Sequence, residues 1–501
     1  MSATAERQAP PEATAPRPQR LLGLRDLPGP WALPGPAWRA NFLLFARDPL
    51  GYLEQLAAYG PMAIFAKGME GGIFRPAADR VPATVFAYGP DLLGKAFNSG
   101  HAVFRSIHIS TPPGASYARL SWGLQRLHGE EHRKHRKLVM PAFHGKRLDG
   151  YRNCLVEAAD AAMSQWVPGG TIDLVDETRR LLLVFLNKAF LGLGEHETRG
   201  VLSLGENLEI LWKNVMSVLV RVPVDLPFSP RRRARHHADS VALEIEQLIA
   251  RKRQAKDKGD DMLAMLLDAR DENGGGMTED ELVGQLSFLI FAGFESTIHA
   301  VAFAADLVAQ HPEVAARLYE EVHGLLKGDA PTVDQLKALP YLDAVTKECL
   351  RLLSPVPFLI RTTQEEVELG GYLLPPRTEI MLSIYHTHRM SAIYTDPNRF
   401  QPERWASIEP STYEYLPFSV GPHMCAGWAL ALMEMKVLLS MFVQRFRLDV
   451  RPTDRIDRRV MATMGPRPGM FLNVHRQDKN FAASRAPVVG QLARMVEIPF
   501  A

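Results

Sequence analysis

Cysteine is scarce in this sequence of 501 residues, which contains only Cys154, Cys349 and Cys425. Three cysteines this far apart are too few for a disulfide framework or a zinc cluster, which need more thiols at closer spacing. Proteins without disulfides are typical of reducing compartments. We therefore expect a cytoplasmic protein whose fold does not depend on disulfides or zinc.

An excess of charge of one sign is also lacking. The chain has 58 Lys and Arg residues against 56 Asp and Glu residues, which gives a formal net charge of +2. General binders of nucleic acid and other polyanions carry a clear basic excess. The balance argues against a nucleic acid as a partner.

Long hydrophobic runs are missing as well. We find no run that approaches the roughly 18 to 20 apolar residues needed to span a bilayer. The nearest, residues 181–193, is interrupted by Asn187 and Lys188 and predicts an amphipathic core helix. Residues 1–22 are rich in Ala, Pro, Arg and Glu, lack the apolar segment of a secretory signal, and predict a disordered tail. We expect a soluble protein without a transmembrane anchor.

The rest of the chain predicts one large domain over residues 23–476, mainly α with a minor β region. Short strands are expected within 62–90 and 355–385, long helices between 150 and 350, and a proline-rich meander over 396–417. The clearest helix begins after Thr278, which follows three glycines, and continues to about Gln310. We assign no role to residues 477–501.

Cys425 lies in the most informative motif, the stretch from Phe418 to Gly427. A small-residue loop containing Gly421 precedes the cysteine, and apolar residues at helical spacing follow it. Backbone N–H groups and the helix dipole at such a position stabilise a thiolate. A lone cysteine is most often a small buried hydrophobe, but this spacing favours the proximal ligand of a haem iron.

A second motif lies within the long predicted helix, where Glu295, Ser296 and Thr297 follow Ala292 and Gly293. Hydroxyl residues compete with the backbone for hydrogen bonds inside helices, and glycine there costs about 1 kcal/mol relative to alanine. A kink in a core helix would explain the motif. The alternative is a shallow site with a carboxylate and hydroxyls for proton delivery.

Two further groups of charged residues stand out. Glu348 and Arg351 share one helix face, and with Arg404 they could form a structural clamp. The segment 129–137 is strongly basic; His132 and Arg136 can face inward while its other cations face solvent, where they would suit an acidic electron-transfer partner.

Together these residues closely resemble the cytochrome P450 family, over about 27–476 and in the same order. The resemblance implies a single-domain P450 fold of the soluble bacterial type, with haem b between the long central helix and the cysteine-loop helix. It implies that Cys425 is the axial iron ligand and that Glu348, Arg351 and Arg404 form a buried structural triad. It places Glu295, Ser296 and Thr297 in the catalytic, proton-delivering positions. The haem-binding residues would be His132, Arg136, Ala292, Gly293, Arg361, Phe418, Gly421, His423 and Gly427.

Two residues depart from the usual family pattern. His423 replaces a common arginine, so we expect a weaker contact with a haem carboxylate. Ser296 replaces the usual threonine and loses the methyl group that restricts the rotamer. Coupling of oxygen use to product formation is therefore less certain.

The implied function is a monooxygenase that inserts one oxygen atom from O₂ into a lipophilic small molecule. Because we recognise no reductase domain, electrons would come from a separate ferredoxin or flavodoxin with its reductase. By the same resemblance, the substrate pocket would be lined by residues from about 106–124, 205–230, 356–359 and 464–470. Apolar residues that would make this pocket hydrophobic are Ile107, Ile109, Phe288, Val356 and Phe358. Two alternatives remain: a peroxide-using or hydroperoxide-rearranging enzyme of the same fold, and a non-catalytic haem sensor.

Overall fold

The computed structural model describes most of the chain and supplies the element bounds used below. The described residues are 21–31, 39–68, 71–74, 81–98, 104–106, 115–145, 147–194, 204–208, 210–211, 226, 228–451, 454–461, 463–484 and 488–497. Of the predicted tail, only Leu21 and Leu22 fall within them. Leu22 belongs to a short strand, and the rest of the predicted tail lies outside the described residues.

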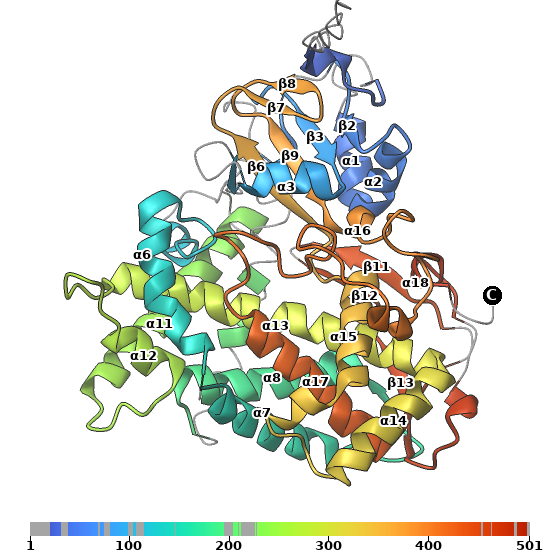
Figure 1. The fold of residues 1–501 in the computed structure, drawn as a ribbon. Coiled ribbons are helices and arrows are strands. Elements are labelled where there is room, and N and C mark those ends of the chain that lie inside the picture. The colour runs from blue at the N-terminus through green and yellow to red at the C-terminus, as the bar shows by residue number, and fades with distance from the viewer. Residues whose placement is uncertain are drawn as a thin grey trace, which may run out of the picture.

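Helices make up most of the described chain, as predicted (Figure 1). The α-helices are α1 (Arg39–Arg47), α2 (Pro49–Ala57), α3 (Pro90–Asn98), α5 (Ala115–Leu120), α6 (Gly129–Val139), α7 (Arg147–Met163), α8 (Leu174–Leu191), α11 (Pro230–Gln254), α12 (Met262–Asp268), α13 (Glu279–Gln310), α14 (Pro312–Leu326), α15 (Pro340–Leu352), α16 (Ile384–Thr387), α17 (Trp428–Arg445) and α18 (Leu492–Met495). Short 3₁₀ helices are η1 (Leu24–Asp26), η4 (Met140–Phe143), η5 (Gln335–Ala338), η6 (Pro402–Ala406) and η7 (Phe481–Ser484).

The strands form small sheets. They are β1 (Leu22–Gly23), β2 (Met62–Ile64), β3 (Thr84–Ala87), β4 (Phe104–Ser106), β5 (Thr171–Asp173), β6 (Phe358–Thr363), β7 (Val367–Leu369), β8 (Tyr372–Leu374), β9 (Glu379–Ser383), β10 (Phe446–Val450), β11 (Asp457–Val460), β12 (Met464–Arg467) and β13 (Phe471–Arg476). The largest sheet has the order β2-β3-β9-β6-β4, and β11 pairs with β12 as an antiparallel hairpin. The predicted mainly α fold with a minor β part is confirmed.

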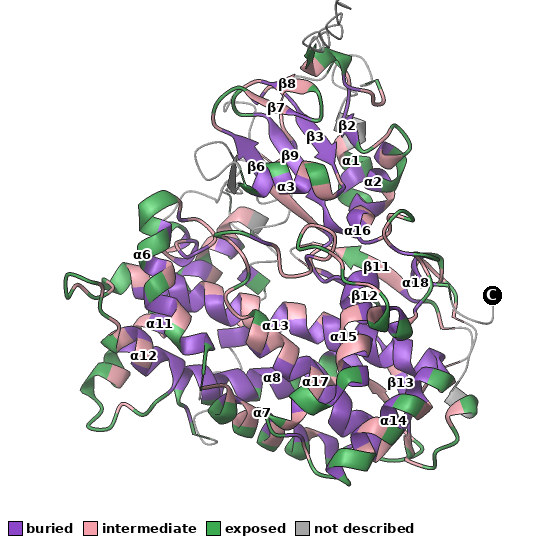
Figure 2. Cartoon of the chain, viewed as in Figure 1, coloured by how far each residue is buried: buried purple, intermediate pink, exposed green. Residues whose placement is uncertain are grey.

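Helix α13 is the centre of the helical part. Its N-terminus is fixed by a capping box, in which the Thr278 hydroxyl accepts from the Glu281 N–H and the Glu281 carboxylate accepts from the Thr278 N–H. The predicted boundaries are therefore correct. The helix packs against α5, α8 and α17, and most of its residues are buried (Figure 2). It positions one wall of the site described below.

One expectation about hydrophobic runs was wrong. Helix α13, and not the 181–193 stretch, is long and apolar enough to cross a membrane. Its charged residues lie mainly in its first turn, which leaves a long apolar segment behind them. Most of that segment is buried inside the protein, as expected for the core helix of a globular domain.

Residues 488–497, one of the two described parts of the C-terminal extension, pack onto the domain. We call them the C-terminal segment. Its Gln491 side chain donates to Asp48 Oδ2 at 2.9 Å and accepts from the Arg458 N–H at 3.2 Å, while the Gln491 N–H donates to Asp457 Oδ1 at 3.0 Å. Asp48 precedes α2, so one glutamine joins α2 to the β11–β12 hairpin. The side chains that the segment buries are Leu492, Met495 and Val496.

Asp306 is a titratable group in the middle of the core. Its side chain on α13 is fully buried, and neither carboxylate oxygen has a hydrogen-bond donor among the residues that the structure describes. Burial raises the pKa of Asp306 to about 7, because the charged form loses its hydration. Between about pH 4 and pH 7 the folded protein therefore binds more protons at this group than the unfolded chain does. Stability contributed by Asp306 is present at low pH and lost as the pH rises through this window.

Replacing Asp306 by asparagine is expected to remove this loss of stability at rising pH. The Tm of the variant minus that of the wild type should rise between about pH 4.5 and 7 and then level off. Thermal unfolding over this pH range checks the expectation, with Glu320→Gln on the exposed surface of α14 as the control. A Tm difference that does not change with pH would show that Asp306 is ionised in the folded protein.

Candidate haem site

The loop before α17 presents Cys425 to the interior. Gly421 has a φ of +76°, a conformation that favours glycine. The Cys425 N–H donates to the Phe418 carbonyl oxygen at 2.9 Å, which closes the loop. Helix α17 begins at Trp428 with Gly427 as its N-cap. As predicted, the cysteine lies just before a helix N-terminus.

The thiol of Cys425 is exposed to a cavity and otherwise surrounded by protein. Burial raises its pKa, whereas the Gly427 N–H and the Arg136 guanidinium act in the opposite direction. The predicted backbone stabilisation of a thiolate is thus present, but burial outweighs it. A metal cation bound to the sulfur would reverse the balance, because coordination deprotonates a thiol.

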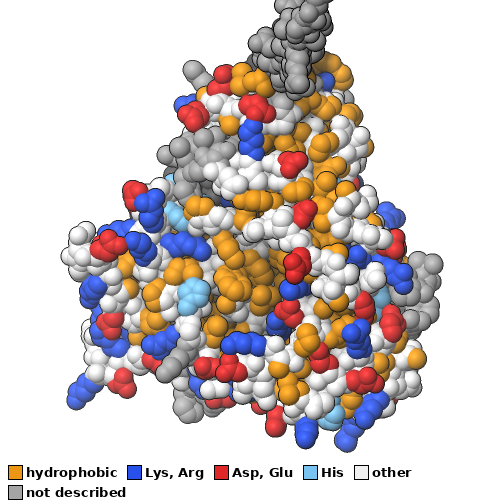
Figure 3. Space-filling view, in the orientation of Figure 1, with side chains coloured by type: hydrophobic (Ala, Val, Ile, Leu, Met, Phe, Trp, Pro, Cys, Tyr) orange, Lys and Arg blue, Asp and Glu red, His pale blue; other side chains and the backbone are white. Residues whose placement is uncertain are grey.

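The cavity has a volume of about 1080 Å³ and lies between α13 and the cysteine loop. Figure 3 shows one face of the molecule hollowed near its centre, with hydrophobic side chains gathered there. The remaining walls come from α1 and α2, β6 and the β11–β12 hairpin. Nine phenylalanines in the lining make it largely apolar: Phe42, Phe45, Phe74, Phe143, Phe190, Phe288, Phe291, Phe358 and Phe418.

The predicted pocket residues lie partly in this lining. Phe288, Val356 and Phe358 contribute to it. Ile107 and Ile109 lie outside the described residues, as does most of the predicted pocket region 205–230. From the 464–470 stretch, Arg467 lines the cavity.

Four residues of the α13 motif line the cavity: Ala292, Gly293, Ser296 and Thr297. The Ser296 hydroxyl donates to the Ala292 carbonyl oxygen, four residues back, at 3.0 Å. A Cβ added at Gly293 would meet Phe190 of α8 at an ordinary 3.5 Å. The missing side chain of Gly293 therefore faces α8, and Gly293 contributes only backbone to the cavity.

The acid beside the hydroxyls is a different one from that expected. Glu295 is buried and does not line the cavity, whereas Glu434 of α17 does. The Thr297 hydroxyl donates to Glu434 Oε2 at 2.9 Å, and burial raises the pKa of Glu434 to about 8. Sequence reasoning missed Glu434; its only signal was an acid among the apolar positions of the cysteine-loop helix.

A cluster of cationic and imidazole groups lies at one side of the cavity. Arg361 of β6 is buried, lines the cavity and has no ion-pair partner among the residues described. Burial lowers its pKa to about 10. Arg136 donates to the Met424 carbonyl oxygen at 2.8 Å, and the rings of His132 and His423 lie 4.0 Å apart. All four of these residues, which were predicted to bind haem, line the same cavity.

The donor set fits haem. A buried guanidinium without an acid is costly, and the two propionates of haem would supply acids to Arg361 and Arg136. The cavity-facing thiol of Cys425 supplies an iron ligand, and the apolar walls suit a porphyrin. Phe418 and Gly427 also line the cavity, as expected of haem-contacting residues.

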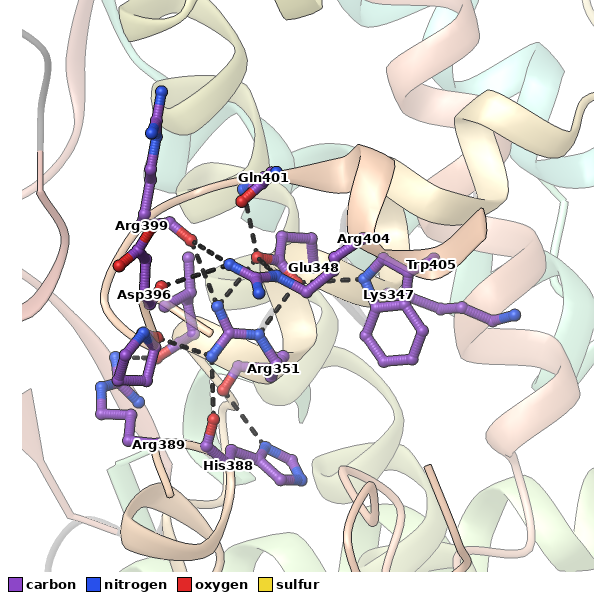
Figure 4. A network of polar contacts seen from close by, with 12 residues as sticks. Lys347, Glu348, Arg351, His388, Arg389, Asp396, Arg399, Gln401, Arg404 and Trp405 are labelled. Carbon is purple, nitrogen blue, oxygen red and sulfur yellow. Dashed lines mark hydrogen bonds and ion pairs between the residues drawn. The ribbon is translucent and has the colours of Figure 1, made fainter. Parts of the chain in front are cut away.

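Glu348, Arg351 and Arg404 form a buried ion-pair network behind the site (Figure 4). Arg351 donates through two nitrogens to the two carboxylate oxygens of Glu348 at 2.9 and 2.8 Å, and Arg404 Nε donates to Oε1 at 2.9 Å. The Gln401 N–H and the Trp405 indole also donate to this carboxylate. The predicted clamp joins α15 to the meander.

His388, which sequence reasoning missed, connects the clamp to the cysteine loop. Arg351 donates to the His388 carbonyl oxygen at 2.8 Å, and the Leu416 N–H donates to His388 Nε2 at 3.0 Å. Because Nε2 accepts, Nδ1 carries the proton and donates to the Arg351 carbonyl oxygen. Burial lowers the pKa of His388 to about 3, so the ring is neutral. Leu416 lies two residues before Phe418, where the loop begins.

The outward cations of α6 do not form a purely basic patch. Their acidic partners come from α6 itself and from residues 271–272. The ion pairs are Arg133 with Glu130 at 2.7 Å, Lys134 with Asp271 at 2.9 Å and Lys137 with Glu272 at 2.6 Å. Any partner of this surface meets alternating charge, which the sequence of α6 alone could not show.

Comparison with known proteins agrees with the family resemblance that the sequence motifs indicated. The family model for cytochrome P450 matches residues 72–473. Cyclooctat-9-en-7-ol 5-monooxygenase of Streptomyces melanosporofaciens is 32% identical over 64% of this chain and 71% of its own length. Cyclooctatin synthase of the same organism is 30% identical over 86% of this chain and 90% of its own. Pentalenene oxygenase of Streptomyces avermitilis is 28% identical over 87% and 94%.

Solved structures agree on the fold. Retinoic acid-bound cyanobacterial CYP120A1 superposes with a TM-score of 0.79 at 24% identity, over 91% of this chain and 99% of that one. The cytochrome P450DA heme domain gives a TM-score of 0.73 at 23% identity, over 91% and 98%.

Proposed function

The chain belongs to the cytochrome P450 family and is a haem-iron oxidoreductase of the monooxygenase type, and we propose that it inserts one oxygen atom from O₂ into a terpenoid or similar lipophilic molecule. The observation that carries the proposal is a shared cavity: the Cys425 thiol and the Ser296 and Thr297 hydroxyls line the same apolar space. The thiol that can bind iron and the two hydroxyls that can transfer protons thus face the same space, which can also bind a hydrocarbon.

We assign the haem-binding roles residue by residue. Cys425 would ligate the iron and Arg361 and Arg136 would pair with the propionates, while His132 and His423 line the same cavity. When bound, a haem with a thiolate ligand supplies oxygen activation, because electron donation from sulfur favours cleavage of the O–O bond. The protein orients the substrate and controls protons and water.

The substrate class rests on the cavity walls and on relatives. The lining is dominated by phenylalanine and aliphatic side chains, which bind hydrocarbon without directional contacts. Two relatives carry the names of a cyclooctat-9-en-7-ol monooxygenase and a pentalenene oxygenase. A cyclic or linear terpenoid therefore suits this cavity.

Proton delivery is assigned to the hydroxyls of α13. Ser296 Oγ lies at the cavity surface with its proton directed to the Ala292 carbonyl oxygen, and it can turn to donate into the cavity. Thr297 Oγ1 joins the cavity to the Glu434 carboxyl group. Glu295, which does not line the cavity, would act only through other groups.

Replacing Ser296 by alanine is expected to leave haem binding intact and to divert electrons from product to hydrogen peroxide. The reason is that loss of one donor from a proton path slows the productive step, typically by about 10²-fold or more. Product and peroxide formed per NADH consumed are the measurements. Ser287→Ala, in the same helix but away from the cavity, is the matched control. Equal product per NADH in wild type and Ser296→Ala would remove Ser296 from the path.

We place the protein in the cytoplasm and assign electron supply to a separate ferredoxin or flavodoxin with its reductase. A surface hollow of about 630 Å³ is lined by α6, by residues just after it and by Pro422 of the cysteine loop, which precedes Cys425 by three residues. NADH-driven turnover with a ferredoxin and ferredoxin reductase tests the proposal. Turnover only with added peroxide would favour a peroxide-using enzyme of the same fold instead.

A further inference from the structure

The β11–β12 hairpin brings two arginines to the opening of the cavity. Arg459 pairs across the hairpin with Gly465, and Arg467 pairs with Asp457. Alternate residues of a strand share a face, so Arg459 and Arg467 lie on the same face as diagonal neighbours. Both arginines line the cavity and are also exposed. They therefore lie where the cavity opens to solvent.

The hairpin is held with this face toward the cavity. A Cβ at Gly465 would lie 2.3 Å from the His299 imidazole of α13, so glycine allows the hairpin to approach the helix. On the opposite face, Arg458 pairs with Asp48 at 3.3 Å and Glu54 at 3.0 Å. Gln491 of the C-terminal segment binds the Arg458 N–H. The two arginines thus project from an anchored support.

Among the described residues, their positive charge is offset only by the cross-strand Asp457, which interacts with Arg467 without forming an ion pair with it. Arg459, Arg467 and the nearby cavity-lining Arg47 form no ion pair with any part of the chain that the structure describes. The cross-strand acid Asp457 is paired with Arg455 at 2.8 Å.

The two acids that line the cavity are also engaged. Asp48 binds Arg458 and Gln491, and Glu434 binds Thr297. Unlike the cations on α6, the arginines at the cavity opening have no ion-pair partner among the residues that the structure describes.

We propose that Arg459 and Arg467 form a subsite for the carboxylate of a lipophilic acid, which is the substrate class of this enzyme. The inference rests on the proposed function and extends it. Guanidinium groups bind carboxylates through paired N–H donors at short distance. A diphosphate would call for a bound divalent cation, and no group of three or more acidic, His or Cys side chains suited to a metal occurs among the described residues.

A carboxylate at the opening also orients the substrate. The head group stays at the hairpin, and the hydrocarbon extends along the phenylalanine-lined walls toward Ser296 and Cys425. Oxidation then falls on the half of the molecule remote from the carboxylate. Regiochemistry thus follows from where the charge is held.

The test compares acids and alcohols with the same carbon skeleton. The haem-loaded enzyme is titrated with farnesoic acid and farnesol, and with dodecanoic acid and dodecanol, and the Kd is read from the spin-state shift. We expect each acid to bind at least about tenfold tighter than its alcohol, as charge-assisted hydrogen bonds permit. Raising the salt concentration from about 0.05 to 0.5 M should weaken binding of the acids alone.

In the double variant Arg459→Gln/Arg467→Gln, the Kd values of an acid and its alcohol should differ by no more than about twofold, mainly because the acid binds more weakly. Arg476→Gln, an exposed arginine on β13 that does not line the cavity and forms no ion pair with the described residues, should keep the preference. The subsite is refuted if no acid preference exists in the wild type, if neither acid binds, or if the double variant retains the preference. Alcohol that binds and is oxidised without acid preference would refute the subsite and leave the monooxygenase function standing.

Discussion

Replacing Cys425 by alanine is expected to abolish the red-shifted Soret band of the reduced, carbon monoxide-bound protein, together with all O₂-dependent turnover. Cys425 has the one cysteine sulfur that lines the cavity in the described part of the chain. Without it the iron has no thiolate to donate electrons, and the chemistry that depends on that donation stops. Visible spectra and haem content of the purified variant provide the measurement.

The other two cysteines are built-in controls. Cys349 is buried on α15, and Cys154 is half-buried on α7; burial raises the pKa of both thiols. Cys154→Ala and Cys349→Ala should keep the red-shifted band, although Cys349→Ala leaves a small cavity in the core. A Cys425→Ala protein with a normal spectrum and normal turnover would overturn the central assignment.

Replacing Glu348 by glutamine is expected to destabilise the protein by about 3 to 5 kcal/mol and to reduce haem retention, because two buried guanidiniums lose their counter-charge. Arg351 and Glu348 are completely buried, and Arg404 is nearly so. The damage should extend to the cysteine loop through His388, which joins Arg351 to Leu416. Denaturant unfolding and haem content per protein are the measurements.

A second i, i+3 ion pair, which lies on the surface, separates the effect of burial on stability from the effect of charge. Asp334 and Lys337 lie 2.8 Å apart on the surface, with 90% and 75% of their side chains exposed. Asp334→Asn should leave stability and haem content unchanged, since water and side-chain motion screen an exposed pair. Equal effects of the two substitutions would mean that the Glu348 network stabilises nothing beyond an ordinary surface contact.

The features that could be predicted from sequence are those whose geometry depends on residues close together in the chain. The α13 start follows from Thr278 and Glu281, three residues apart. The position of Cys425 follows from the glycine loop and the helix behind it. The buried triad required the family resemblance, because Arg404 lies more than fifty residues from Glu348.

The features that were missed depend on tertiary contact. Glu434 lies in a helical pattern that predicts a core face, and only the packing of α17 against α13 brings it to Thr297. Glu295 was expected in a proton-delivering position, but its buried side chain does not line the cavity, whereas the next two residues of the helix do. The ion pairs of α6 involve residues 271–272, which sequence order does not connect with that helix.

The C-terminal segment has a practical consequence for anyone building with this enzyme. It ends within a few residues of the chain terminus (Figure 1), and Gln491 touches both α2 and the hairpin that borders the cavity opening. An affinity tag or an electron-transfer domain fused after this segment would pull on the residues that hold the hairpin against α2. We therefore expect the linker length of a fusion at this end to affect substrate access. A reductase joined there needs a long, flexible linker if substrate selectivity is to be kept.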